Sequence, residues 1–290
     1  MTRLSPIERS FRQTFLARLS DRFRHHVEAC IDLRGQTDDP LHATYLCPEG
    51  PFLIEVPGMH CRGLHSVAFP MDPNGAHPFI RTVRAIDAGL TDYQASPLCA
   101  YYARYRPETA AAALGLDPAA AHTELMRAPL AASLPWDHRS PAEAEAFWTM
   151  ICERDYRAHG FGLDFSDGWK AWGPLTDRAG KAEFTRLVRA YHSIRAHGYL
   201  RHSAHDGDIM GTILRHADDT RIMLDAGQHR AAVLTALGRA DLPVRLTPAT
   251  INRADVAHWP NVRRGIYTER QALQVFDRVF AGHQPFDADA

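Results

Sequence analysis

The chain has 290 residues, 45% hydrophobic and 23% charged, a composition typical of a globular protein with one large domain or two modest ones. Its 33 basic and 34 acidic residues give a net charge of -1, which excludes an overall positive field that would attract nucleic acid or an acidic membrane. Five scattered cysteines without a C-x-x-C pair argue against a disulfide framework and a cysteine-based zinc site.

The N-terminal residues lead into a charged stretch and not into the apolar core of a signal peptide. No uninterrupted apolar run approaches the roughly 20 residues that cross a bilayer. We therefore expect a cytoplasmic protein without a transmembrane segment. The 17 histidines are spread along the chain, so we interpret most of them as surface or capping residues.

The first predicted element is a helix over residues 5–23. Ser5, Pro6 and Glu8 form a capping box with proline in the first turn. Apolar residues recur every fourth position along it, at Phe11, Phe15, Leu19 and Phe23. We expect this helix to pack on its own domain, and a helix on a membrane surface is the alternative.

Short strands and then helices are predicted up to residue 198. Apolar runs bounded by Pro and Gly predict strands at 45–47 and 52–56, with a further candidate at 66–69. Helical spacing follows over 77–88, and residues 96–160 are predicted to be mainly helical. Capping-box and glycine signals then predict helices at 140–159 and 178–197, with a loop at 161–174 between them.

The C-terminal part has the most regular pattern: a strand, a hairpin turn, a strand, a sharp turn, a helix and a third strand. The strands are predicted at 209–214, 220–225 and 242–246, and the hairpin turn between the first two at 216–219. The sharp turn is at 227 and the helix at 230–237. An amphipathic helix is predicted over 268–280. We expect an α+β fold in which a mixed region, 1–175, packs against or wraps an α/β unit, 176–290. No linker separates the two ranges, so the pattern fits either one domain or two.

The corner between the second strand of this hairpin and the following helix carries the clearest chemical signal. A helix that begins directly after a strand leaves its first N–H groups unpaired, and these attract an anion. Gly227 permits close approach of a ligand, and the fork of Arg230 suits phosphate oxygens. His229 can donate to the same oxygens or act as an acid or base.

Together these residues resemble the ParB/sulfiredoxin-like superfamily over about residues 194–247. Members carry a Gly-x-x-Arg-like signature at the start of a helix, followed by a glycine and a strand containing Pro-Val. Here the pattern reads Asp225-Ala226-Gly227-Gln228-His229-Arg230, then Leu237-Gly238, then Leu242-Pro243-Val244.

The resemblance implies that this turn binds nucleotide phosphates through Gly227, Gln228, His229 and Arg230. Sulfiredoxins use ATP, chromosome-partitioning ParB proteins bind CTP, and free-serine kinases of this fold phosphorylate a small hydroxyl compound. ATP or CTP, with Mg²⁺, is therefore the implied cofactor.

At three places the sequence differs from the patterns of these families, and each difference argues against one of their functions. Sulfiredoxins carry a catalytic cysteine where this chain has Gln228, so reduction of sulfinic acids is not expected. The serine kinases have an aspartate where this chain has Ala226, which puts direct transfer of their mechanism in doubt. No helix-turn-helix pattern follows Leu246 and the chain is not basic, so DNA binding is not expected.

Asp206 and Asp208 precede the hairpin and are the candidate catalytic and metal-binding carboxylates. They are suited to hold Mg²⁺ together with phosphate oxygens, and one of them is suited to act as a general base. A turn with a carboxylate capping backbone amides fits the pattern equally well. Further on, Arg253, Arg263 and Arg264 are candidate phosphate ligands, and Trp259 is a candidate stacking surface. The alternative places Trp259 on the core and the arginines in water.

The sequence thus favours a phosphotransferase that acts on a small-molecule or glycan hydroxyl, with His229, Asp206 and Asp208 as catalytic candidates. The alternative is a nucleotide-binding switch or accessory protein without catalysis. The neutral charge disfavours a nucleic-acid-binding function.

Overall fold

A computed structural model describes residues 30–158, 162–201 and 207–286. The helix expected over 5–23 and the candidate Asp206 lie outside these ranges. Within them, no helix is long and apolar enough to cross a membrane. The five cysteines are free, as expected from their spacing.

Seven strands form one mixed sheet in the order β1-β2-β7-β5-β6-β3-β4. The strands are β1 (Ile31–Asp32), β2 (Phe52–Pro57), β3 (Cys61–Gly63), β4 (Phe69–Pro70), β5 (Ile209–His216), β6 (Asp219–Ala226) and β7 (Asp241–Asn252). The α-helices are α2 (Pro40–Leu46), α3 (Pro78–Asp87), α4 (Pro97–Arg104), α5 (Ala110–Ala113), α6 (Pro141–Ala158), α7 (Asp177–His197), α8 (Gln228–Ala236), α9 (Pro260–Arg263) and α10 (Glu269–Ala281). Short 3₁₀ turns connect them: η1 (Gly58–His60), η2 (His65–Val67), η3 (Tyr93–Ala95), η4 (Pro118–Ala120), η5 (Thr123–Met126), η6 (Pro129–Ala131), η7 (Phe165–Asp167) and η8 (Arg253–His258).

The sheet joins strands from both of the expected ranges, 1–175 and 176–290. β5 and β6 form an antiparallel hairpin, and β7 lies parallel to β5 on its other side. β2 pairs antiparallel with β7, with Ile54 opposite Val244. The mixed sheet and its surrounding helices confirm an α+β architecture at this level.

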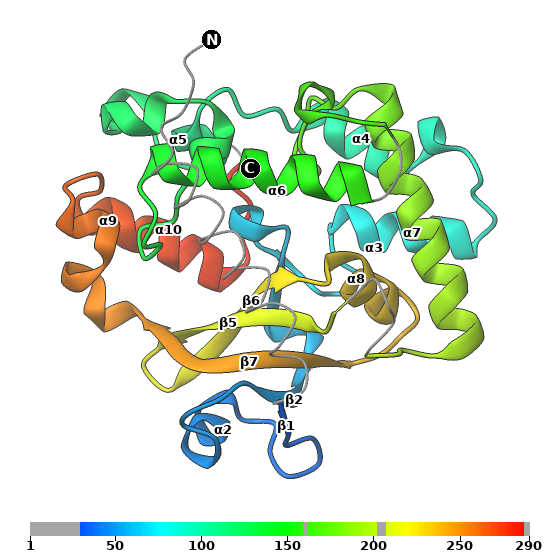
Figure 1. Ribbon diagram of the computed structural model, residues 1–290, viewed down its shortest axis with the longest axis horizontal. Helices are drawn as coiled ribbons and strands as arrows, with labels where there is room; N and C mark the ends of the chain where they lie inside the picture. Colours follow the sequence, from blue (N-terminus) through cyan, green and yellow to red (C-terminus); the bar gives the residue numbers. More distant parts are fainter. Residues whose placement is uncertain (1–29, 159–161, 202–206, 287–290) are drawn as a thin grey trace, which may run out of the picture.

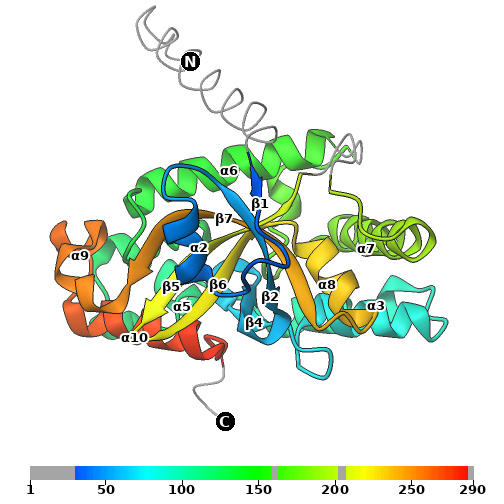
Figure 2. The same ribbon diagram turned by 90° about the horizontal axis from the view of Figure 1, so that it is seen from below.

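The two faces of the sheet belong to different cores because side chains alternate along a strand. On β6, Ile222 and Leu224 join the core formed with α3, α7 and α8, whereas Met223 joins the core formed with α10. Figure 1 shows α3, α7 and α8 gathered at one end of the sheet and α9 and α10 at the other, and Figure 2 shows the same division from below.

Most predicted elements appear at or near their expected places, but two strand predictions were wrong. Residues 45 and 46 are the last residues of helix α2, and Cys47 caps its C-terminus. This segment is helical because Asp39 caps the N-terminus of the helix and Pro40 occupies its first turn. Residues 66–69 form most of η2 and the start of the two-residue strand β4. The left-handed backbone of Ala68, with φ of 63°, prevents a straight strand there.

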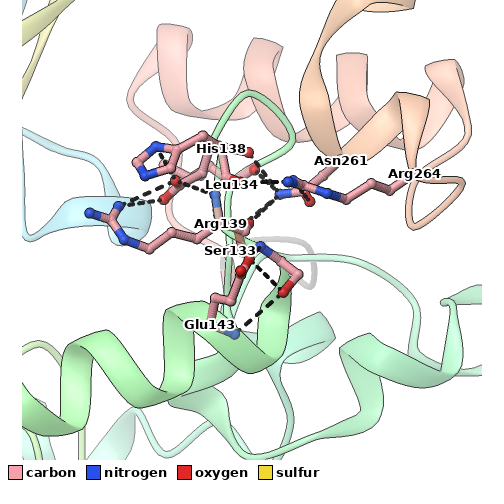
Figure 3. Close-up of polar contacts among 9 residues, drawn as sticks. Ser133, Leu134, His138, Arg139, Glu143, Asn261 and Arg264 are labelled. Carbon is pink, nitrogen blue, oxygen red and sulfur yellow. Dashed lines mark hydrogen bonds and ion pairs between the residues drawn. The ribbon is translucent and has the colours of Figure 1, made fainter. Parts of the chain in front are cut away.

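Asn261 ties the C-terminal part of the chain to the loop 133–139 (Figure 3). It is completely buried, and its amide nitrogen lies 2.9 Å from Ser133 Oγ and 2.9 Å from the carbonyl oxygen of Arg139. Its side-chain oxygen accepts a hydrogen bond from Arg264 at 3.0 Å. Trp259, beside it, is 5% exposed and packs on Trp136. Trp259 therefore anchors this segment on the core, which is the alternative considered for it.

Candidate functional site

The predicted corner lies between β6 and α8. β6 ends at Ala226, Gly227 takes a left-handed conformation with φ of 78°, and α8 begins at Gln228. A Cβ atom on Gly227 would lie 2.8 Å from the Cα of Ile209. Both the backbone angle and this contact require glycine, so the turn brings the start of α8 directly against the start of β5.

The first turn of α8 has unpaired donors. The backbone N–H of Ala231 bonds to the carbonyl of Gly227. In the part of the chain that the structure describes, the N–H groups of Gln228 and His229 have no hydrogen-bond acceptor. Two unpaired donors at the positive end of a helix dipole favour an anion at this corner.

The Gln228 side chain is used within the protein. It is 7% exposed, accepts a hydrogen bond from the N–H of Leu64 at 3.0 Å and donates one to the carbonyl of Leu224 at 2.8 Å. Only the backbone N–H of this predicted cofactor-binding residue is left for a ligand. The side chain instead connects α8 to β6 and to the segment that enters η2.

His229 is paired with a carboxylate that the sequence analysis did not identify. Its Nε2 lies 2.9 Å from Oε2 of Glu183 on α7, and its ring stacks on Phe79 with centroids 4.9 Å apart. Glu183 is 1% exposed and also accepts a hydrogen bond from Arg186, which in turn contacts Asp155. The predicted catalytic histidine is thus the end of a buried charged network.

Burial, more than the charges around it, lowers the pKa of His229 and favours the neutral ring. Burial would raise the pKa of Glu183, but the guanidinium of Arg186 and the hydrogen bond with His229 outweigh burial and lower it. Burial, together with Arg186, lowers the pKa of His229 more than Glu183 raises it. Glu183 therefore carries a negative charge balanced by Arg186. A neutral His229 that donates Nε2–H to Glu183 keeps a lone pair on Nδ1.

Asp208 directly precedes β5, and Arg230 lies in the first turn of α8. Asp208 is 1% exposed and is held by Arg201 through two hydrogen bonds, at 2.9 and 3.1 Å. The guanidinium of Arg230 lies 3.4 Å from the carbonyl oxygen of Asp208 and 6.0 Å from the centre of the Tyr199 ring. The structure thus brings Asp208 next to the helix terminus, as expected, but already paired with a cation.

The residues around the corner do not form a ready Mg²⁺ site. Within the described ranges there is no group of three or more His, Cys, Asp or Glu residues that could hold a metal ion. Asp208 would first have to release Arg201. Mg²⁺ commonly binds to phosphate oxygens with only one or two carboxylates, so phosphates would have to supply most of its ligands here.

Arg253 lies away from the other predicted ligands. Its neighbour Asn252 pairs with Arg215 near the end of β5. The neighbour of Gly227, Ala226, pairs with Met210 at the beginning of β5. Its guanidinium binds Asp277 on α10 at 2.6 and 2.8 Å. Arg253 is therefore at the opposite end of β5 from the corner.

Glu183, Arg201 and Arg245 are residues of this region that the sequence analysis missed. Glu183 occupies the buried face of α7, where an amphipathic pattern calls for an apolar residue. Arg245 is 7% exposed within β7, and its guanidinium has no hydrogen bond or ion pair among the described residues. A charged residue at a position that the period marks as buried was the available signal for Glu183, whereas Arg245 alternates with the apolar Val244 and Leu246 and so gave no such signal. Arg201 had no comparable signal.

No protein-family model matches the chain, and neither a curated protein nor a solved structure matches it.

Proposed function

We propose that the β6–α8 corner binds the phosphates of a nucleotide, ATP or CTP, and that the protein transfers a phosphoryl group to a small-molecule or glycan hydroxyl. The observation that carries the proposal is the pair of unpaired N–H groups, of Gln228 and His229, behind the left-handed Gly227. Phosphate oxygens are the acceptors that such a terminus favours.

The side chains at the corner have distinct roles in this proposal. Arg230 stabilises the phosphate charge from the first turn of α8. Glu183 orients His229 through Nε2, so that Nδ1 can accept the proton of an acceptor hydroxyl as the hydroxyl oxygen attacks the γ-phosphorus. The bond from that phosphorus to the bridging oxygen breaks at the same time, and the nucleoside diphosphate leaves with this oxygen. Because His229 is neutral when Glu183 is paired with Arg186, its lone pair is available at neutral pH.

A non-catalytic nucleotide-binding switch is the second candidate. The observation that favours it is the two hydrogen bonds between Asp208 and Arg201, which occupy the candidate catalytic carboxylate Asp208. In that case the nucleotide would bind to the same corner without transfer.

Thermal unfolding with each nucleotide tests binding. A ligand that binds only the folded chain at one hundred times its Kd adds about 2.7 kcal/mol to the free energy of unfolding. We expect ATP or CTP to raise the melting temperature of the wild type and of Arg253→Gln, and to have a much smaller effect on Arg230→Gln. No shift with any nucleoside triphosphate would contradict the proposal.

Phosphate release and transfer, measured with Mg²⁺ and each nucleotide, separate the two candidates. We expect His229→Gln to keep nucleotide binding and to lose transfer. A wild type that binds nucleotide without forming any acceptor-dependent product would favour the switch.

A further inference from the structure

A recess lies between α3, α4 and the end of the described chain. It has a volume of about 340 Å³ and shares no residue with the β6–α8 corner. Its aromatic lining comes from Phe69, Tyr101, Tyr105 and Phe286. A volume of this size is at the lower end of the range of small-molecule sites, about 300–1,000 Å³.

The aromatic lining is packed and preformed. The ring of Phe286 lies 4.4 Å from that of Tyr105 and 6.2 Å from that of Phe69, measured between centroids. The hydroxyl of Tyr101 donates to the carbonyl of Ala171, which fixes the orientation of this ring. A flat apolar group in the recess would contact these rings.

Two arginines complete the recess. Arg81 on α3 and Arg104 on α4 line it, and none of its lining residues is acidic. Both are exposed, and neither guanidinium has a hydrogen bond or an ion pair within the described ranges. Arg84 lies next to the recess in a smaller hollow that it shares with Arg81. The charge of this rim is therefore positive and not neutralised by the described residues that line it.

We propose that this recess binds a small aromatic carboxylate, whose ring lies on the aromatic lining while its carboxylate pairs with Arg81 and Arg104. The planar guanidinium fork matches a carboxylate and binds it through charge-assisted hydrogen bonds. The complementarity of an apolar lining with a cationic rim selects this ligand class over neutral aromatics and over purely ionic solutes.

Calorimetry with naphthoate and its uncharged amide tests the proposal on the full chain. We expect naphthoate to bind at least tenfold more tightly than the amide, because charge-assisted hydrogen bonds with arginine contribute more than neutral ones. The double variant Arg81→Gln/Arg104→Gln should lose this preference, whereas Arg270→Gln, an exposed arginine at the start of α10, should keep it.

Ala100→Trp provides a second variant that leaves both arginines in place. Ala100 is exposed and lines the recess, so the indole should fill it and abolish naphthoate binding without unfolding the protein. Equal binding of naphthoate and amide, or unchanged binding by the double variant or by Ala100→Trp, would overturn the proposal.

Discussion

Gln228 and Leu64 form a contact in which one side chain satisfies two backbone groups. Leu64 has a left-handed backbone, with φ of 56°, and its N–H donates to Oε1 of Gln228. The carbonyl of Leu224 accepts from Nε2 of the same side chain. Because all three residues are buried, neither backbone group has water as a replacement partner.

Replacing Gln228 with alanine should therefore destabilise the fold. The change leaves a buried N–H and a buried carbonyl without partners, which costs about 1–3 kcal/mol for each unsatisfied group. Urea unfolding should show a lower midpoint for Gln228→Ala. Gln94→Ala is a matched control, because Gln94 is exposed and its side-chain hydrogen bonds, with Asp177 and Cys99, are exposed too. Equal midpoints for the two variants would contradict the role of Gln228.

At the scale of elements, Asn261 determines how α9 meets the loop 133–139. The amide of Asn261 lies within 3.2 Å of three carbonyl oxygens of that loop, and its own backbone N–H bonds to the carbonyl of Pro135. A short helix of four residues has little stability of its own, so this contact keeps the segment in place.

Asn261→Ala should loosen both segments together. We expect a loss of about 1–3 kcal/mol in the free energy of unfolding, because the loop carbonyls lose a buried donor. Amide hydrogen exchange should accelerate in the loop 133–139 and in α9, while β5 and β6 keep their protection. Faster exchange that spreads evenly over the sheet, or no change in the loop, would argue against this tether.

The elements that the sequence predicts well are those with strong local signals. Helix α6 begins where Ser140 and Glu143 form the expected capping box. β6, Gly227 and α8 follow one another as predicted, because alternation, a glycine turn and an apolar helix face are local patterns. The strand expected at 45–47 fails because the helix-start signal at Asp39 and Pro40 outweighs the apolar run that follows it.

The partners of the site residues were not predictable in the same way. The pairing of His229 with Glu183 joins residues 46 positions apart, and no periodicity in the sequence specifies such a contact. Arg253 was placed with the phosphate site by its nearness in sequence, but β7 is long enough to carry it to the other end of β5. The position of the corner followed from local patterns, whereas its chemical environment depends on long-range packing.

For the whole molecule, buried neutral histidines link stability to pH. His77 is completely buried, its Nδ1 accepts a hydrogen bond from the N–H of Phe79 at 3.2 Å, and burial lowers its pKa to about 3. An unfolded histidine has a pKa of about 6.5. Below that pH the unfolded chain binds a proton that the folded chain does not. His77 therefore favours unfolding increasingly as the pH falls from 6.5 toward 3.

His77→Asn should remove this contribution and keep a side-chain acceptor for the N-terminus of α3. Between pH 7 and pH 5 the wild type should lose about 2 kcal/mol more than the variant, as follows from the shift in pKa. Denaturant unfolding at the two pH values measures the difference. His138→Asn is the control, since the side chain of His138 is 77% exposed. The same pH dependence in His77→Asn and in wild type would contradict the account.

The central claim is that phosphate binds to the N–H groups of Gln228 and His229. Its most direct test follows the amide resonances of the labelled protein during titration with ATP, CTP and inorganic triphosphate. The account predicts that the amides of Gln228 and His229 shift in a saturable way, that those at Asn252 and Arg253 stay in place, and that Arg230→Gln weakens the response. Unmoved amides at Gln228 and His229 at saturating triphosphate, or shifts confined to another part of the chain, would contradict it.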